Sequence, residues 1–372
     1  MTNSDAQFAE QLLAWWDEHG RHDLPWQQNP TAYRVWVSEI MLQQTQVSTA
    51  ERYYDRFMHA FPDIATLAQS SQDDVLHHWS GLGYYSRARN LHKAAQLVVE
   101  RHAGTMPTML DELTALPGIG RSTAGAILSL AFDQRQPILD GNAKRVLARV
   151  FVVEGWAGSA ANLKKLWEFA ERCTPRDRVA NYTQAIMDIG ATLCTRTKPA
   201  CIDCPLQTQC AAYAAGLVAT IPAPKPKKSR PTRSAVLVMA VSKSGEILLE
   251  KRPPTGIWGG LWSFPEVDSI EAVDEWCANR LGTVPASKQA WPDVSHSFSH
   301  FEFAMTPVAV KLEADDEVKK EPDDYSGVRS HAGEIMEADR WLWYNTRSPA
   351  GIGLAAPVTR LLQQLGSQTG EQ

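Results

Sequence analysis

Apolar residues recur at helical spacing through the first 215 positions of the chain. Apolar side chains stand three and four positions apart, the period of one helix face, in the segments 8–16, 35–61, 75–79, 91–99 and 163–169. Short breaks rich in Gly, Pro and Ser separate these segments. The pattern predicts an all-α domain over residues 1–215.

A stretch rich in proline and basic residues then interrupts the apolar pattern. Residues 221–231 contain four prolines and four basic side chains. This composition favours an extended, unpacked chain. We therefore expect a linker at 216–232.

Beyond the linker, short runs of strand-forming residues replace the helical period. The runs 235–241 and 247–250 flank a Lys243-Ser-Gly245 turn, a pattern typical of a β-hairpin. Further strands are expected at 301–310 and 340–343, and helices at 270–281 and 358–365. The sequence predicts a smaller α+β domain at 233–365 and a disordered tail at 366–372.

Composition and the lengths of the apolar runs restrict where in the cell we expect the protein. Apolar residues make up 44% of the 372 positions, enough for a packed core. No run of 18 apolar residues occurs, so no membrane helix is expected. The first 20 residues lack the order of a secretion signal. We expect a monomeric cytoplasmic protein, associated with the nucleoid and not with a membrane.

Charge is unevenly distributed. The net charge is −5, yet residues 101–230 contain 17 Lys and Arg against 10 Asp and Glu. Residues 231–372 contain 13 against 20. A basic central segment favours one DNA-facing surface, although ordinary variation of charge along a chain is the alternative.

Four cysteines form a cluster with the spacing C-x6-C-x2-C-x5-C. They are Cys194, Cys201, Cys204 and Cys210. Because cytoplasmic thiols stay reduced, a tight cluster favours metal binding over disulfides. Four thiolates hold either zinc or an iron–sulfur cluster. The spacing departs from paired C-x-x-C zinc knuckles and so favours the cluster, with zinc as the alternative.

Residues 113–127 predict a helix, a tight turn and a second helix. Pro117 ends the first helix, and Gly118 and Gly120 leave backbone N–H groups bare. The second helix begins at about Arg121 and adds the positive end of its dipole. Such a hairpin, at about 111–130, suits a DNA phosphate, although other helix–turn–helix segments share its outline.

Two acidic residues suit the cleavage of a glycosidic bond, which needs an acid at the leaving group and a negative charge near the sugar. Glu39 lies among apolar residues at 35–42, where poor solvation would raise its pKa. A solvent-facing helix position is the alternative. Asp140 precedes a helix, so a helix N-cap is its alternative role.

These motifs resemble those of a known family. The cysteine spacing and the Leu116-Pro-Gly-Ile-Gly120 hairpin resemble the endonuclease III superfamily of helix-hairpin-helix glycosylases. Ser38–Val47 resembles the catalytic-acid motif of MutY-type adenine DNA glycosylases, and Leu139–Asn142 resembles their catalytic aspartate motif. The resemblance covers residues 5 to about 365.

The resemblance implies an adenine-specific DNA glycosylase that acts on double-stranded DNA with A:8-oxoguanine or A:G mispairs. It implies one [4Fe-4S] cluster on the four cysteines at 194–210. Glu39 would protonate adenine at N7, Asp140 would stabilise the cationic sugar, and Asn142 would orient these groups. Bifunctional relatives carry a lysine where this chain has Ser122. Because serine forms no Schiff base, a monofunctional enzyme is implied.

Other segments resemble those that flip and read bases. Gln44, Thr45 and Tyr84 lie in wedge-like segments, with Gln44 and Tyr84 as the intercalating side chains. Leu24, Trp26 and Asp188 map to the adenine pocket. Relatives carry glutamate at the last of these positions, so Asp188 is a departure with a shorter reach.

Residues 256–266 resemble a Nudix-type domain, of which Gly260 and Glu266 keep the opening motif. The metal-binding remainder is absent at 274–275 and 278–279, so pyrophosphate hydrolysis is not expected. In the MutY-type family this domain recognises the oxidised guanine. The resemblance assigns that recognition to Phe298, Ser299 and His300, with Ser299 bonding the lesion.

The expected fold is thus multidomain: an all-α helix-hairpin-helix glycosylase core with an iron–sulfur loop, followed by an α+β Nudix-like C-terminal domain. Three other functions remain as alternatives. They are an endonuclease III-like glycosylase/lyase for oxidised pyrimidines, a non-catalytic DNA-binding protein and a Nudix hydrolase.

Overall fold

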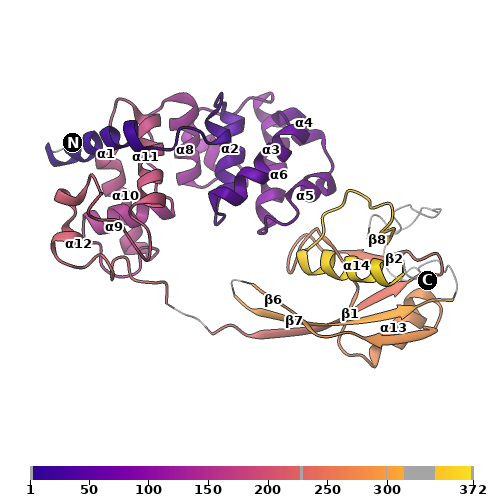
Figure 1. Cartoon of the computed structure of the whole chain (residues 1–372). Coiled ribbons are helices and arrows are strands. Elements are labelled where there is room, and N and C mark those ends of the chain that lie inside the picture. Colours follow the sequence, from indigo (N-terminus) through magenta and orange to yellow (C-terminus); the bar gives the residue numbers. More distant parts are fainter. Residues whose placement is uncertain (1–2, 227–228, 299, 314–339, 370–372) are drawn as a thin grey trace. The chain divides into compact units, whose positions relative to one another are not determined.

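The computed structural model describes residues 3–226, 229–298, 300–313 and 340–369, which form two units (Figure 1). The first unit comprises Met1–Ser70 and Arg89–Lys227, and the second comprises Ser71–Ala88 and Lys228–Gln372. The sequence pattern did not predict that the short segment Ser71–Ala88 groups with the C-terminal part of the chain.

The first unit is helical, as the apolar spacing predicts. Its longer elements are α1 (Asn3–His19), α2 (Ala32–Leu42), α3 (Val47–Ala60), α4 (Ile64–Gln69), α7 (Leu110–Thr114), α8 (Arg121–Phe132), α9 (Gly141–Val150), α10 (Ala160–Cys173) and α11 (Val179–Thr192). Single-turn elements are η1 (Pro25–Gln27), η2 (Gln207–Gln209) and α12 (Ala211–Ala214). Helix α6 (Ser86–His102) begins in the second unit and continues in the first.

Local signals explain where several of these helices begin. The side chains of Thr31 and Ser159 accept hydrogen bonds from the backbone N–H three residues ahead, and so cap α2 and α10. The helices then bury a shared apolar core, in which Leu12, Leu147 and Leu166 are fully buried. Removing this apolar area from water holds α1, α9, α10 and α11 together.

The second unit contains a mixed β-sheet together with helices α5, α13 and α14, whose bounds are given below (Figure 1). Its strands are β1 (Thr232–Val241), β2 (Ile247–Lys251), β3 (Trp262–Ser263), β4 (Glu266–Val267), β5 (Ser287–Ala290), β6 (Val294–Ser297), β7 (Glu302–Lys311) and β8 (Trp341–Tyr344). The order is β3-β2-β1-β7-β5, with β4 paired to β1, β6 to β7 and β8 to β2.

The pairing of β1 and β2 confirms the predicted hairpin, because the two strands are antiparallel with Val241 opposite Ile247. Strand β7 runs parallel to β1 along its full length, from Thr232 opposite Glu302 to Val241 opposite Lys311. Helix α13 (Ala272–Leu281) packs Val273 and Leu281 into the apolar core of this sheet.

Helix α14 (Ala356–Thr369) corrects the predicted start of the tail. Residues 366–369 were expected to be disordered, but the helix continues through them. Its last turns are supported by a bond from the Ser367 hydroxyl to the Gln363 carbonyl at 2.9 Å. Residues 370–372 lie outside the described part.

Contacts with the C-terminal segment explain why Ser71–Ala88 belongs to the second unit. This segment contains α5 (Gln72–Trp79) and the turn that follows it. The hydroxyls of Ser80 and Tyr85 donate to the Leu354 carbonyl at 3.0 and 3.3 Å. Lys251 forms an ion pair with Asp73 at 3.0 Å.

The beginning of the predicted linker is packed, which differs from the unpacked chain expected there. Ile221 is 4% exposed, and the Ala223 N–H donates to the Gly155 carbonyl at 3.0 Å. An apolar side chain ahead of the proline-rich residues thus lies against the first unit. Within the described residues, no helix has the length and apolar content needed to cross a bilayer.

Candidate active site

A cavity of about 290 Å³ lies in the first unit between α2 and α11. Leu24, Trp26 and Glu39, three of the residues predicted from the sequence, line it. Its wall is otherwise largely apolar, with a few polar side chains, as in sites that enclose small organic groups. The structure therefore gathers these three residues around a single space.

Glu39 is the acidic residue of this cavity. It lies on α2 and is only partly exposed. Burial, and secondly the negative charge of Asp140, raise the pKa of Glu39 to about 8. A carboxyl group with this pKa is largely protonated at neutral pH, and so has a proton to donate.

Asp140 is the N-cap of α9, the role that the sequence offered as an alternative to catalysis. Its Oδ1 accepts a hydrogen bond from the Ala143 N–H at 2.7 Å. Burial raises the pKa of Asp140, while backbone hydrogen bonds and the positive charge of Arg145 oppose the rise. The cap position also fixes the carboxylate near Glu39, so the two roles are compatible.

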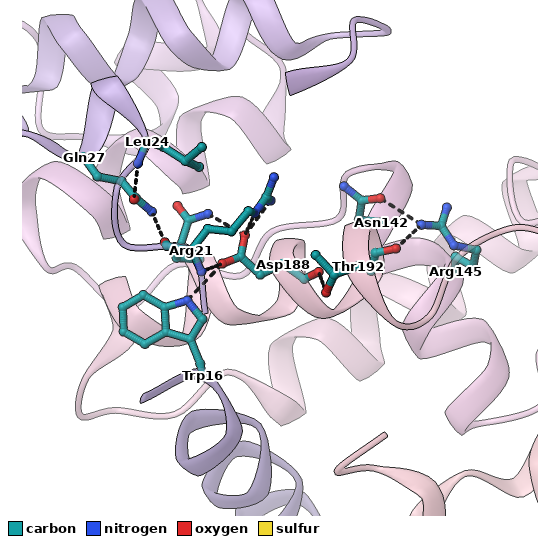
Figure 2. Close-up of polar contacts among 10 residues, drawn as sticks. Trp16, Arg21, Leu24, Gln27, Asn142, Arg145, Asp188 and Thr192 are labelled. Atoms are coloured by element: carbon teal, nitrogen blue, oxygen red, sulfur yellow. Dashed lines mark hydrogen bonds and ion pairs between the residues drawn. The ribbon is translucent and has the colours of Figure 1, made fainter. Parts of the chain in front are cut away.

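Asn142 is held by Arg145 on the same helix (Figure 2). Arg145 Nη2 donates to Asn142 Oδ1 at 2.8 Å and to the Gly190 carbonyl at 2.6 Å. Arg145 Nε donates to the Cys194 carbonyl at 2.7 Å. One guanidinium thus connects the turn after Asp140, helix α11 and the cysteine loop.

Asp188 is fully buried and is absent from the residues that line the cavity. Its carboxylate accepts hydrogen bonds from Trp16 Nε1 and from the backbone and side chain of Arg21 (Figure 2). A further bond comes from Gln184 Nε2 at 2.9 Å. With both oxygens occupied, Asp188 orients other side chains, and the structure does not bring it into the pocket.

Gln184 lines the cavity, yet the sequence did not single it out. It lies four residues before Asp188 on α11, so the two share one helix face. Arg21 also lines the cavity without having been singled out, and it lies in the non-helical segment between α1 and η1. The sequence did contain a signal for Gln184: it stands four positions before Asp188, one helical turn away.

The predicted hairpin joins α7 to α8. Gly118 has φ +80°, and a Cβ there would lie 2.9 Å from Asn90 Cβ. Gly120 is the N-cap of α8 without a side-chain cap, and a Cβ there would meet nothing within 4 Å. The start of α8 is therefore open to an anion, as an N–H-rich helix end requires.

The Ser122 side chain is hydrogen-bonded to the backbone just before Asp140. Its hydroxyl accepts a hydrogen bond from the Leu139 N–H at 2.9 Å. The Ser122 side chain thus supports the irregular segment that leads into the N-cap of α9.

The two predicted intercalating residues share an unusual backbone conformation. Gln44 has φ +59° and Tyr84 has φ +50°, both in the left-handed region that side chains other than glycine rarely adopt. Gln44 is exposed, and Tyr84 is 49% exposed. Thr45 is partly exposed, and its N–H donates to the Leu42 carbonyl at 3.3 Å. Gln44 belongs to the first unit, and Tyr84 to the second.

The predicted recognition loop lies between β6 and β7. The Phe298 N–H donates to the Phe301 carbonyl at 2.9 Å, and the two rings stack with centroids 4.6 Å apart. His300 is exposed and packs its ring against Phe301. Ser299 lies outside the described residues.

The four clustered cysteines line one apolar cavity at the end of α11. Burial raises the pKa of Cys204 to about 11; a backbone hydrogen bond from Leu206 opposes this rise, and the neighbouring cysteines add to it. No three candidate ligands in the described chain surround one point closely enough for a single ion. Four thiols around one apolar space do fit a larger group with four thiolate ligands.

In the second unit, Glu266 is ion-paired with Arg252 at 2.9 Å, and both side chains are nearly buried. The carboxylate that keeps the opening of the Nudix motif is thus already paired.

Comparisons with known proteins agree with both parts of the fold. Residues 37–172 match the model of the HhH-GPD superfamily base excision DNA repair protein, and residues 236–364 match the NUDIX domain. A thermostable thymine-DNA glycosylase structure is 26% identical, with a TM-score of 0.51, over 57% of this chain and 97% of that one. The fold and site thus define a base-excision-repair DNA glycosylase with an appended NUDIX domain.

The particular family follows from two relatives. The chain is 37% identical over 356 residues to the adenine DNA glycosylase of Buchnera aphidicola subsp. Acyrthosiphon pisum (strain APS), covering 96% of this chain and 97% of the relative. It is 33% identical over 380 residues to that of Homo sapiens, covering 85% of this chain and 69% of the relative. The chain belongs to the adenine DNA glycosylases.

Proposed function

We propose that the enzyme hydrolyses the N-glycosidic bond of adenine mispaired with 8-oxoguanine or guanine in double-stranded DNA. The observation that carries this proposal is Glu39 in the wall of a largely apolar cavity, where burial and the nearby Asp140 raise its pKa to about 8. An acid and a nearby carboxylate are the two groups that glycosidic cleavage needs.

The steps of adenine hydrolysis follow from a protonated Glu39 and a negatively charged Asp140. Glu39 gives its proton to N7 of the everted adenine, so the electron pair of the C1′–N9 bond leaves with a neutral base. The sugar becomes an oxocarbenium ion, which the Asp140 carboxylate stabilises. Asn142, oriented by Arg145, positions the turn that holds Asp140. Water adds at C1′ and gives its proton to the Glu39 carboxylate, which restores the acid and leaves an abasic site.

Adenine recognition is assigned to the cavity wall. Leu24 and Trp26 supply apolar surface against the purine. Because Gln184 Nε2 donates to the acceptor-only Asp188 carboxylate, Oε1 of Gln184 is the atom left for the adenine amino group. In this assignment Asp188 is a positioning residue.

DNA binding is assigned to four further places. Gly118 and Gly120 present the hairpin amides to a phosphate. Gln44 and Thr45 fill the space left by the everted base, and Tyr84 inserts beside the opposite guanine. Phe298, Ser299 and His300 form the loop that reads the oxidised guanine.

The four cysteines are proposed to hold one [4Fe-4S] cluster, which would cross-link the loop at 194–210. An endonuclease III-like lyase reaction is not favoured, because the Ser122 hydroxyl forms no imine. Borohydride treatment should therefore trap no covalent complex with DNA.

The test measures base release from duplexes that contain A:8-oxoguanine, A:G or an oxidised pyrimidine, with alkali cleavage of the abasic product. We expect release of adenine from the first two duplexes alone. Glu39→Gln should abolish release while preserving duplex binding, and Glu10→Gln, an exposed acid on α1, should release adenine normally. Intact A-containing mispairs with the parent enzyme would refute the proposal.

A further inference from the structure

Arg149 connects the cysteine loop to the linker through one buried guanidinium. The residue lies on α9 and is 2% exposed. Its Nη1 donates to Cys194 Sγ at 3.2 Å and to the Thr195 carbonyl at 2.8 Å. Its Nη2 donates to the Arg196 carbonyl at 3.3 Å, and its Nε donates to the Ile221 carbonyl at 2.9 Å.

The charge of this guanidinium needs a negative partner, since an uncompensated buried charge is costly. Among the described residues, no carboxylate lies within ion-pair distance of Arg149. Three of its acceptors are neutral carbonyls, and the fourth is the sulfur of Cys194. That sulfur becomes an anion when it binds a metal centre.

The linker segment that accepts from Arg149 is docked over several residues. The Ile221 side chain is 4% exposed and belongs to the apolar core of the first unit, and the Ala223 N–H donates to the Gly155 carbonyl at 3.0 Å. Lys225 Nζ lies 5.7 Å from the centroid of the Trp156 ring. The Arg149 bond is therefore one part of a continuous attachment between 221 and 225.

We propose that Arg149 couples metal loading of the cysteine loop to docking of the linker. The guanidinium donates at once to a thiolate ligand and to the Ile221 carbonyl, so the thiolate charge holds it in the position that the linker needs. When the metal and its thiolate charge are lost, Arg149 is no longer held in place, and the linker is released. This proposal rests on the proposed cluster at the four cysteines.

The coupling is reciprocal by thermodynamic necessity. If the loaded loop favours docking of the linker, then docking of the linker slows loss of the metal. The two directions give two independent measurements, neither of which depends on catalytic activity.

The first measurement is hydrogen exchange of the amides at 217–226 in iron-loaded protein. Arg149→Lys keeps the charge but lacks the planar fork that reaches sulfur and carbonyl together, and Arg149→Met removes the charge. We expect exchange at 217–226 to rise about 10-fold or more in both variants, because local opening sets the exchange rate. Lys165→Met, an exposed charge on α10, should leave exchange unchanged.

The second measurement is the rate at which a chelator removes iron. Arg149→Lys should lose iron faster than the parent. Ala223→Pro removes the N–H that donates to Gly155 and should also speed iron loss, although it touches neither Arg149 nor a cysteine. This linker variant keeps the proposal testable if Arg149→Met fails to fold.

Unchanged exchange at 217–226 in iron-loaded Arg149→Lys would overturn the coupling. The coupling would also be overturned if Ala223→Pro raised hydrogen exchange at 217–226 but left the rate of iron loss unchanged. The iron content of the purified parent enzyme is measured first. A parent enzyme without iron would refute the proposed cluster. This measurement therefore distinguishes failure of the proposed cluster from failure of the coupling.

Discussion

The Asp188 carboxylate accepts a hydrogen bond from Gln184 Nε2 at 2.9 Å, one turn apart on α11. The same carboxylate pairs with the Arg21 guanidinium and accepts from Trp16 Nε1. A buried acid thus orients three side chains that line the cavity, Trp16, Arg21 and Gln184, although Asp188 itself does not line it.

Asp188→Asn should therefore damage both stability and adenine recognition. The asparagine side chain would place an NH2 group, itself a donor, against the N–H groups that now donate to the Asp188 carboxylate. It would also leave the Arg21 guanidinium without its negative partner. We expect a loss of about 2–4 kcal/mol in the free energy of unfolding, because removing one member of a buried pair strands the other. Denaturant unfolding checks this value. Single-turnover kinetics should show a lower rate of adenine release, even where duplex binding is kept.

Asp17→Asn is the matched control, because Asp17 pairs with Arg178 where both side chains are about half exposed. Water already screens that pair, so little change is expected. Equal losses in the two variants would contradict the special role of Asp188.

Gly120→Ala and Gly118→Ala separate DNA binding from folding. At Gly120 a methyl group has open space within the protein, so the free energy of unfolding should change little. The methyl would crowd a phosphate at the start of α8, and duplex affinity should fall several-fold. At Gly118, φ +80° and contact with Asn90 should cost about 1–2 kcal/mol of stability as well. Fluorescence anisotropy with a labelled duplex measures the affinity, and unaltered affinity in Gly120→Ala would exclude a phosphate there.

Gly190→Ala should displace Asn142 on the neighbouring helix α9. A Cβ at Gly190 would lie 2.5 Å from Asn142 Cβ, so α9 and α11 must separate. We expect a loss of about 1–3 kcal/mol in unfolding free energy and slower adenine release. Ala191→Ser, at the exposed neighbouring position, provides the control. Retention of full activity in Gly190→Ala would show that the position of Asn142 tolerates movement.

The pH dependence of adenine release should reflect Glu39. Its pKa of about 8, raised mainly by burial, keeps the acid protonated below that pH. The single-turnover rate should therefore be highest below about 8 and decline as the pH rises through it. A rate that stays constant well above this pH would mean that Glu39 does not deliver the proton.

Stability should change with pH in the corresponding direction. The pKa of Glu39 is about 8 in the folded protein against an ordinary 4.5, so the unfolded chain releases this proton first. Its contribution to stability is fully present below 4.5 and is lost as the pH rises towards 8. Glu39→Gln cannot ionise, and its unfolding free energy relative to the parent should increase over that window. If the unfolding free energies of the parent and Glu39→Gln changed in parallel with pH, the raised pKa of Glu39 would be contradicted.

The sequence by itself determined the elements and their chemistry wherever the cause is local. Helical spacing predicted the helical unit, the turn at Lys243–Gly245 predicted the β1–β2 hairpin, and glycines in series predicted an open start to α8. These features depend on residues a few positions apart, whose backbone preferences and apolar faces are readable without the rest of the chain.

Only the tertiary structure decided which of these residues work together. Asp188 and Arg21 are 167 positions apart, and Arg149 and Ile221 are 72 apart. The segment Ser71–Ala88 joined the sheet unit through carbonyls near Leu354. Such pairings arise when packing leaves a buried charge or donor that must find a partner, and no local pattern records where that partner will come from.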